Sequence, residues 1–324
     1  VGIGGITLGG GIGYLVRKYG LTIDDLLAVD IVTADGNLLR ADAESHPDLF
    51  WALRGGGGNF GVATRFRLRL HQVDSIVGGM LMLPATPQLI QSFIAEAEAA
   101  PDELSTIANV MPAPPMPFVP AEQHGQLSIL ALMCFVGPPE AGERAMVPFR
   151  ALATPIADML RPMPYPEIYP PDEEGYHPRS AVRTMFVDSV DTATAETIVG
   201  HVQASSAMMA VAQLRVLGGA MARVSPDATA FAHRNRRIMA TVAALYEQPG
   251  EAPKHEEWAS RFAASLWDGE PAAYVNFLGD EGEERVRQAY PGSTWDRLCS
   301  VKSQYDPTNL FRLNQNIPPA GAGS

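Results

Sequence analysis

The sequence begins with VGIGGITLGGGIG at residues 1–13, in which seven of thirteen positions are glycine. Glycine lacks a Cβ atom and reaches positive φ at little steric cost, so such a stretch lets the backbone approach a ligand and direct several N–H groups at it. Apolar residues then recur at helical spacing over residues 12–19, and Gly20 is a helix-ending residue. The pattern predicts a glycine turn before a helix N-terminus, where a phosphate binds. A crowded turn that only packs structural elements together is the alternative.

Composition limits the classes of protein and partner. The chain has 324 residues, which suits two domains of about 100–200 residues each. A formal net charge of −12 leaves no general basic field, so we expect neither nucleic acid nor membrane as a partner. The two cysteines stand in no metal-ligand spacing, and no metal site is predicted. The longest apolar run, residues 127–136, is shorter than the ~20 residues of a membrane helix.

A second glycine run, GGGGNFG at residues 55–61, contains a formal G-x-G-x-x-G pattern. In a dinucleotide-binding Rossmann fold this pattern follows a strand and opens a helix. Here a helix is predicted before it, at residues 45–53, and an alternating strand after it, at residues 62–70. The context therefore disfavours a nicotinamide-dependent dehydrogenase.

The remaining elements predict an α+β fold. Asp35-Gly36 separates two apolar runs and predicts a hairpin over residues 26–39. Beyond residue 73, strands alternate with single helices, which favours an antiparallel sheet with helices on one face. Strands are predicted at residues 76–83, 105–111, 127–136, 181–187, 212–217 and 238–246. Helices are predicted at residues 87–99, 138–152, 192–205 and 256–266, and an irregular proline-rich loop at residues 155–178.

Two late stretches carry polar side chains. The alternation of AYVNFL at residues 273–278 predicts a strand with Tyr274 and Asn276 on one face, addressing a polar ligand or lying at a solvated sheet edge. Farther on, Asp306-Pro307 ends a helix, because proline lacks an amide donor and disfavours helix in the preceding residue. The amide-rich tail that follows is predicted to dock on the fold.

Several motifs in this order resemble the flavin-linked oxidases of the berberine bridge enzyme type, within the vanillyl alcohol oxidase superfamily. They are V-G-x-G-G-x-T-L-G-G-G-x-G at residues 1–13, R-K-Y-G-L at 17–21, D-L-F-W-A-L-R-G-G-G-G-N-F-G-V at 48–62, Y-x-N at 274–276 and Y-D-P-x-N-x-F at 305–311. The middle of the chain resembles the family only in the order of strands and helices.

This resemblance implies a two-part FAD-binding domain made of N- and C-terminal segments, with an inserted antiparallel-sheet substrate domain covered by helices. The expected division is residues 1–72 for the later part of a PCMH-type FAD module, 73–282 for the substrate domain and 283–324 for the returning segment. Because the chain begins inside a motif, we expect the earlier part of the module, with the family's flavin-linking histidine, to precede Val1. Covalent attachment of FAD is left open.

The resemblance also implies roles for individual residues. The first glycine stretch would lie along FAD, through Val1, Gly2, Gly4, Gly5, Thr7, Leu8, Gly9, Gly10, Gly11 and Gly13, and the second glycine run would support it. Ile31 and Val32 would offer backbone to the adenine end. Tyr274, Asn276 and Asn314 would face the isoalloxazine ring and the substrate. Val1 matches the small residue that leaves oxygen access to the flavin.

The implied activity is an FAD-dependent oxidase that removes hydride from a C–H bond beside a hydroxyl or similar group, with oxygen as the final acceptor. Tyr274 is the candidate base. Weaker candidates are Tyr246, His233 and Glu247. Some relatives have a tyrosine base where this chain has Phe277, and a histidine where it has Ile6.

The expected partners are a small-molecule substrate and oxygen; substrate identity, compartment and oligomeric state are not predicted. The alternative is a non-catalytic scaffold that does not bind FAD.

Overall fold

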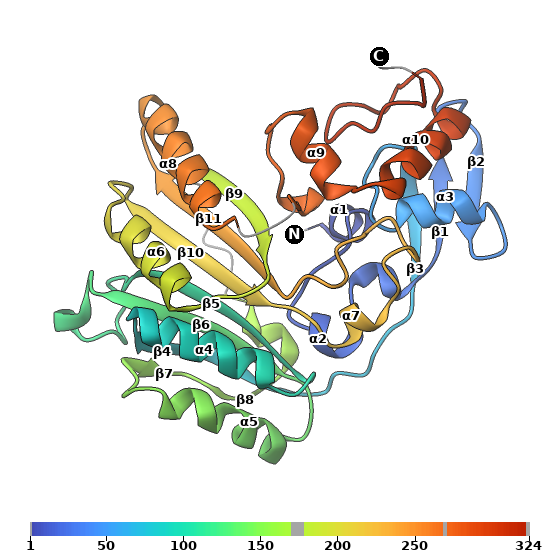
Figure 1. Ribbon diagram of the computed structural model, residues 1–324. Coiled ribbons are helices and arrows are strands. Elements are labelled where there is room, and N and C mark those ends of the chain that lie inside the picture. Colours follow the sequence, from blue (N-terminus) through green and yellow to red (C-terminus); the bar gives the residue numbers. More distant parts are fainter. Residues whose placement is uncertain (1, 170–177, 268–270, 322–324) are drawn as a thin grey trace. The chain divides into compact units, whose positions relative to one another are not determined.

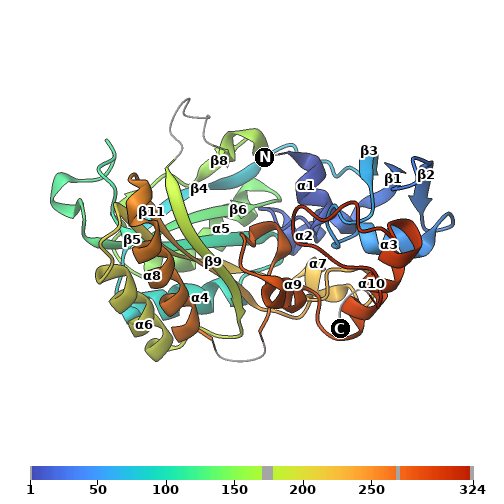
Figure 2. The same ribbon diagram turned by 90° about the horizontal axis from the view of Figure 1, so that it is seen from above.

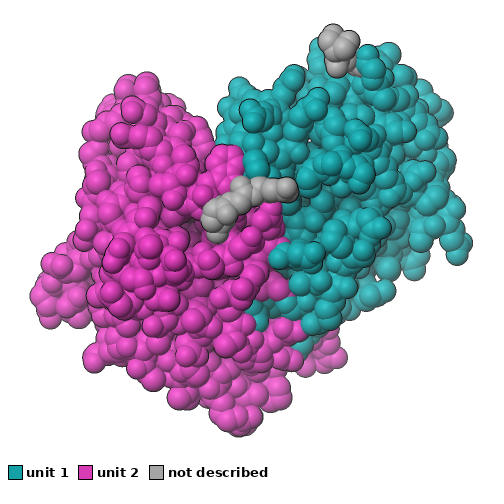
Figure 3. Space-filling model, viewed as in Figure 1, with its two compact units in different colours: residues 1–71, 219–235, 271–324 teal, residues 72–218, 236–270 magenta. Residues whose placement is uncertain are grey.

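The computed structural model describes residues 2–169, 178–267 and 271–321 (Figure 1). The chain divides into two compact units (Figure 3). Unit 1 comprises Val1–His71, Gly219–Asn235 and Pro271–Ser324, and unit 2 comprises Gln72–Gly218 and Arg236–Glu270. In the described ranges, no helix is both long and apolar enough to cross a membrane.

Unit 1 contains a three-stranded antiparallel sheet in the order β2-β1-β3. The strands are β1 (Leu26–Val32), β2 (Leu38–Asp42) and β3 (Val62–Leu68). The predicted hairpin between β1 and β2 is confirmed, with Gly36 in its turn at φ 81°. Helices α3 (Pro47–Leu53) and α10 (Ser293–Tyr305) bury their apolar side chains in one core with β1. The second glycine run lies between α3 and β3, in the helix-before, strand-after context that the sequence predicts.

The first glycine stretch folds differently from the prediction. Residues expected to form only a turn include a short helix, α1 (Ile3–Leu8), and the helix expected from residue 12 begins later, as α2 (Val16–Tyr19). Gly10 and Gly11 separate the two helices because their φ angles, 132° and 91°, are incompatible with a helix. Gly20 ends α2 as predicted, at φ 88°.

The strand predicted at residues 273–278 is a single 3₁₀ turn, η5 (Val275–Phe277). The Phe277 amide donates to the Tyr274 carbonyl at 2.9 Å, a local bond that replaces strand pairing. The other elements of unit 1 are η1 (Thr22–Asp24), α7 (Ala220–Arg223) and α9 (Glu283–Ala289).

Unit 2 is an eight-stranded antiparallel sheet in the order β7-β4-β6-β5-β10-β11-β9, with β8 also paired to β4. Its strands are β4 (Ile76–Pro84), β5 (Leu104–Pro112), β6 (Leu127–Phe135), β7 (Ala157–Asp158), β8 (Arg161–Met163), β9 (Arg179–Val187), β10 (Met209–Val216) and β11 (Ile238–Tyr246). Short 3₁₀ turns are η2 (Ala121–Gln123), η3 (Tyr165–Ile168) and η4 (Pro249–Glu251). The expected loop at 155–178 therefore contains β7, β8 and η3, and its residues 170–177 lie outside the described part.

Four helices cover one face of this sheet (Figures 1 and 2). They are α4 (Pro87–Ala99), α5 (Pro139–Ala151), α6 (Thr192–Gln203) and α8 (Ala252–Ser265). Each contributes buried apolar side chains to the core, among them Phe93, Phe149, Ile198 and Phe262. The predicted antiparallel sheet with helices on one face is confirmed.

The compact units differ from the predicted domain division in two segments. The first segment of unit 1 ends at His71, one residue before the predicted end of the first domain at residue 72. Residues 219–235 and 271–282, however, belong to unit 1 rather than to the middle of the chain. Buried polar bonds described below join these segments to the region of the first glycine stretch. The assignment of cofactor and substrate to separate domains stays a prediction.

Candidate functional site

Unit 1 contains a pocket of about 280 Å³ where three distant stretches of sequence meet. The second glycine run, η5 and the C-terminal tail form its walls. The lining residues are Gly57, Gly58, Asn59, Val275, Asn276 and residues 310–315. The structure thus brings Asn276 and Asn314, two residues singled out from the sequence, to one pocket with the second glycine run.

Asn276 is held on one side of this pocket by two hydrogen bonds. Its Nδ2 donates to the Ile6 carbonyl oxygen at 3.1 Å and to the Tyr274 hydroxyl at 2.9 Å. Its Oδ1 lies against Gly9, where a Cβ atom would overlap it. The expectation that Tyr274 and Asn276 lie on one side is therefore met, although their backbone is a turn rather than a strand.

Tyr274 joins η5 to the end of the first glycine stretch. Its hydroxyl oxygen accepts hydrogen bonds from the Gly11 amide at 3.0 Å and the Ile12 amide at 3.2 Å, in addition to the bond from Asn276. The side chain is only 2% exposed. Three N–H donors therefore surround one buried oxygen. Its role as base stays a prediction.

The glycines of the first stretch fall into two groups. A Cβ atom on Gly9, Gly10 or Gly11 would meet protein atoms closer than ordinary contact, so close packing explains these three. In contrast, a Cβ on Gly2, Gly5 or Gly13 would meet nothing within 4 Å, so the backbone there is open to a ligand. The crowded turn therefore describes Gly9, Gly10 and Gly11, whereas ligand binding by the open glycines stays a prediction.

Other predicted residues of this stretch have internal roles. The buried Thr7 hydroxyl donates to the Ile3 carbonyl at 2.7 Å. The Leu8 carbonyl accepts from the amides of Gly55 and Gly57, both at 3.0 Å, and so connects the two glycine runs. A Cβ on Gly4 would be in ordinary contact with the Phe66 ring at 3.5 Å. Val1 lies outside the described residues.

Ile31 and Val32 lie in β1, the central strand of the unit 1 sheet. Each has Cα partners on both β2 and β3. Ile31 is fully buried. Strand pairing accounts for this stretch of backbone, and a contact with the adenine end of FAD stays a prediction.

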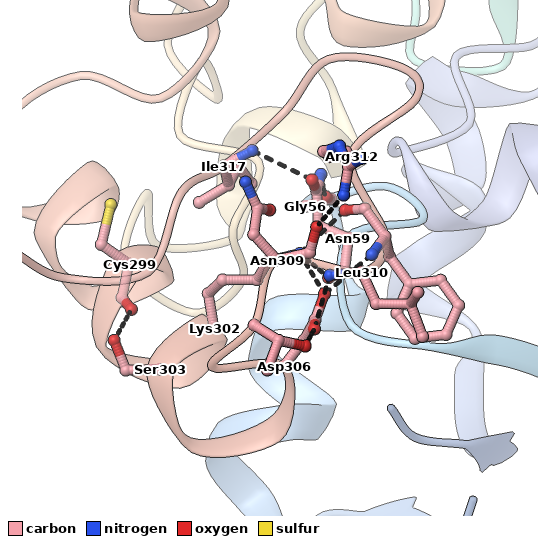
Figure 4. Close-up of polar contacts among 12 residues, drawn as sticks. Gly56, Asn59, Cys299, Lys302, Ser303, Asp306, Asn309, Leu310, Arg312 and Ile317 are labelled. Carbon is pink, nitrogen blue, oxygen red and sulfur yellow. Dashed lines mark hydrogen bonds and ion pairs between the residues drawn. The ribbon is translucent and has the colours of Figure 1, made fainter. Parts of the chain in front are cut away.

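The C-terminal tail is fixed by a buried ion pair at the end of α10 (Figure 4). The Lys302 ammonium donates to Asp306 Oδ2 at 2.6 Å, to the Asn59 carbonyl at 2.7 Å and to the Phe311 carbonyl at 2.8 Å. Asp306 in turn accepts from the amides of Leu310 at 2.8 Å and Phe311 at 2.9 Å. The sequence reasoning identified Asp306 only as a helix end and missed Lys302.

Charge and hydrogen bonding decide the ionisation of Asp306. Burial by itself would raise its pKa, but the hydrogen bonds from Lys302 and from the Phe311 and Leu310 amides outweigh it and lower the pKa. Asp306 therefore ionises more readily than a free carboxyl group. Burial lowers the pKa of Lys302, and the hydrogen bond and charge of Asp306 oppose that shift.

Asn59 is a second link between the tail and the glycine run. Its Nδ2 donates to the carbonyls of Gly56 at 2.9 Å and Gln315 at 3.0 Å, and its Oδ1 accepts from the Ile317 amide at 3.0 Å. These bonds position the tail segment that contains Asn314.

A buried Arg234–Asp24 pair fixes the segment 219–235. The guanidinium makes two 2.8 Å bonds to the Asp24 carboxylate and one 2.8 Å bond to the Thr229 hydroxyl, and its side chain is 0% exposed. Asp24 belongs to η1. The Thr22 and Ile23 amides of η1 donate to the Gly11 and Gly10 carbonyls, both at 3.1 Å. Sequence reasoning missed this pair, because no local pattern signals it.

The weaker base candidates do not line the pocket. His233 is buried and its Nε2 bonds to the Gln288 carbonyl at 3.0 Å. Tyr246 stacks on His255 in unit 2, with ring centroids 4.9 Å apart. Glu247 is exposed. Their proposed roles as a base stay untested.

Comparison with known proteins identifies the family. The family described as berberine and berberine like matches residues 273–318, and the family described as FAD binding domain matches residues 1–42. The FAD-linked oxidoreductase YgaK of Bacillus subtilis (strain 168), itself uncharacterized, is 32% identical over 333 residues, which cover 98% of this chain and 70% of YgaK. The chain belongs to the berberine-like FAD-linked oxidoreductases.

A relative that is named as an oxidase and a solved structure agree with this assignment. (R)-6-hydroxynicotine oxidase of Paenarthrobacter nicotinovorans is 29% identical over 99% of this chain and 71% of its own length. The crystal structure of 6-hydroxy-D-nicotine oxidase from Arthrobacter nicotinovorans superposes with a TM-score of 0.82 at 25% identity, covering 98% of this chain and 71% of that one. The comparisons confirm the fold class, FAD as the cofactor and the enzyme class predicted from the sequence, in preference to a non-catalytic scaffold.

The residues of unit 1 fit FAD. Open glycine backbone at Gly2, Gly5, Gly13 and Gly58 leaves space for a ligand at van der Waals distance. The amide side chains in the pocket are neutral hydrogen-bonding groups, which suit a flavin ring or a ribityl chain. A pocket of about 280 Å³ is at the lower limit of ligand sites, so it accommodates part of FAD rather than the whole molecule.

Proposed function

We propose that this berberine-like FAD-linked oxidoreductase is an oxidase of a small molecule, and that unit 1 binds FAD through the open glycines, Asn276 and Asn314. The oxidised carbon would bear a hydroxyl or a comparable activating group. When bound, FAD supplies the hydride acceptor, its N5 atom, and passes the electrons to oxygen.

The observation that supports this proposal most strongly is the convergence of the family motifs on one pocket. Asn276 comes from the Y-x-N motif, Gly57 and Gly58 from the second glycine run, and Asn314 from the tail. The first glycine stretch joins this arrangement through the bonds from Gly11 and Ile12 to Tyr274. Two segments near the start of the sequence and two near its end thus come together around one pocket, which supports a ligand site there.

The residues of the chain would have distinct tasks. Backbone N–H groups of the open glycines would bind polar atoms of the cofactor. Asn276 and Asn314 would orient the part of FAD within the pocket.

Tyr274 is proposed as the proton acceptor. Its hydroxyl is the one titratable group of the Y-x-N motif, and it lies 2.9 Å from Asn276 Nδ2. Because the side chain is buried, the proton would have to reach it from the side of Asn276, which lines the pocket. Tyr274 itself is not a lining residue, and none of the described residues that line the pocket carries a carboxylate or an imidazole.

A peroxide-coupled screen of the purified native protein tests the proposed function. The panel contains hydroxylated nitrogen heterocycles, including (R)-6-hydroxynicotine because a relative bears that name, together with sugars, alkaloids and aromatic alcohols. Substrate-dependent release of peroxide in air, together with bleaching of the bound flavin by the same substrate when oxygen is excluded, supports an oxidase. Flavin that a substrate bleaches but oxygen does not restore would instead indicate a dehydrogenase.

A further inference from the structure

The orientation of the Asn276 amide group is fixed by what surrounds it. Ile6 presents a backbone carbonyl, which only accepts hydrogen bonds, at 3.1 Å. The nitrogen of the amide must therefore face Ile6, and its second hydrogen is used by the Tyr274 hydroxyl. Since a reversed amide would place two acceptors against each other, this orientation follows from the hydrogen-bond network.

The oxygen of Asn276 is left for a ligand. Within the described part of the chain, Asn276 Oδ1 accepts no hydrogen bond, and Asn276 lines the pocket. Both hydrogens of its amide are already used. The side chain can therefore offer a ligand an acceptor but no donor.

Gly9 provides the space for this oxygen. Its φ and ψ angles, −94° and −2°, are accessible to any residue, so conformational freedom does not explain a glycine here. A Cβ atom would overlap Oδ1 and approach the nitrogen of Asn276 to 2.7 Å. The side chain of Asn276 could keep its present position only while residue 9 is glycine.

We propose that Asn276 acts as a fixed hydrogen-bond acceptor for an N–H or O–H group of FAD, and that Gly9 is the positioning residue that gives its oxygen the required place. This inference rests on the proposed FAD site. It states which partner donates the hydrogen bond: the FAD group donates and Asn276 Oδ1 accepts. A phosphate or a ring carbonyl has no hydrogen to donate and therefore does not face Asn276.

Two substitutions of Asn276 test the polarity. Asn276→Asp keeps an acceptor oxygen and removes the amide donor, whereas Asn276→Leu has a similar size and keeps neither. FAD is titrated into deflavinated native protein and variants, with binding followed by flavin fluorescence and folding by thermal unfolding. We expect the FAD Kd to rise about tenfold in Asn276→Leu, and less in Asn276→Asp. An Asp variant that unfolds at the native temperature yet binds FAD as weakly as the Leu variant would overturn the assignment, and so would a Leu variant that binds FAD as tightly as the native protein.

Gly9→Ala tests the steric part, with Gly200→Ala as its matched control. Gly200 lies in α6, where an added Cβ meets nothing within 4 Å. We expect Gly9→Ala to raise the FAD Kd about tenfold or more, and Gly200→Ala to leave it unchanged. Native-like FAD binding by Gly9→Ala would overturn the role of Gly9. If the native protein itself does not bind FAD, the proposed function and this inference are both overturned. If the native protein binds FAD and only the expected effects of the variants are missing, this inference alone is overturned.

Discussion

The Lys302 ammonium and the Asp306 carboxylate lie 2.6 Å apart, and both side chains are fully buried. They are one helical turn apart in sequence, at the end of α10, and each makes further bonds to the tail (Figure 4). Such a pair contributes little net stability compared with apolar residues, but removing one partner leaves the other charge buried and unpaired. Here it fixes the path of the tail that contains Asn314.

Asp306→Asn should therefore destabilise the protein strongly. Because the lysine would lose its counter-charge while remaining buried, we expect the free energy of unfolding to fall by about 3–5 kcal/mol. Urea unfolding provides the measurement. The control is Glu257→Gln in the exposed Arg261–Glu257 pair, whose side chains are 68% exposed, and its effect should stay below about 1 kcal/mol. Equal effects of the two substitutions would show that the buried pair has no special role.

The same carboxylate predicts an acid-sensitive stability. The pKa of Asp306 is lower in the folded state than its usual value, so the unfolded chain binds the proton more readily. Its contribution to stability is present above the pKa of the unfolded chain and is lost as the pH falls through the folded pKa. We expect unfolding midpoints measured from neutral to acidic pH to fall more steeply for the native protein than for Asp306→Asn. Parallel curves would contradict the prediction.

Tyr274→Phe tests the proton acceptor. The substitution keeps the ring contacts with Phe231 and Phe277 but removes the oxygen that accepts three N–H bonds. If the hydroxyl accepts the proton, turnover should fall by about 10²-fold or more in a protein that retains flavin. Turnover with an identified substrate and flavin content are measured together. Near-native turnover would end the proposed role, and loss of flavin with little loss of turnover per bound flavin would assign the tyrosine to positioning alone.

Arg234→Lys should weaken the attachment of residues 219–235 to unit 1. A lysine cannot reproduce the two parallel bonds to Asp24 together with the bond to Thr229. We expect a loss of about 2–3 kcal/mol in the free energy of unfolding. Arg65→Lys is the matched control, because the Arg65 side chain is 80% exposed, and it should change stability by less than about 0.5 kcal/mol. An Arg234 variant as stable as this control would show that the buried pair is dispensable.

The sequence predicted most of unit 2 because its signals are local. Apolar strands such as residues 127–135 and capped helices such as α4 and α6 are recognisable within short windows. The caps are visible in the structure, where Thr86 and Asp191 side chains accept amide bonds at the helix N-termini. Tyr274 and Asn276 could be predicted to lie on one side for the same reason, because they are only two residues apart in the sequence.

The polar bonds that build the site escaped prediction because they join distant parts of the chain. Asp24 and Arg234 are 210 residues apart, and Gly11 and Tyr274 are 263 apart. Helix α1 was missed for a different reason: glycine disfavours helix locally, and tertiary packing against Asn276 outweighs that preference. Family motifs supplied what local patterns could not, namely which distant segments meet.

The visible absorption spectrum of the purified native protein, supplied with FAD and freed of unbound flavin, tests the central claim most directly. We predict flavin absorbance bands that correspond to about one FAD per chain, as expected for one site in unit 1. Acid precipitation of the same sample then shows whether the flavin is covalently attached, since attached flavin stays with the pellet. A folded protein that remains colourless after incubation with FAD would contradict the account.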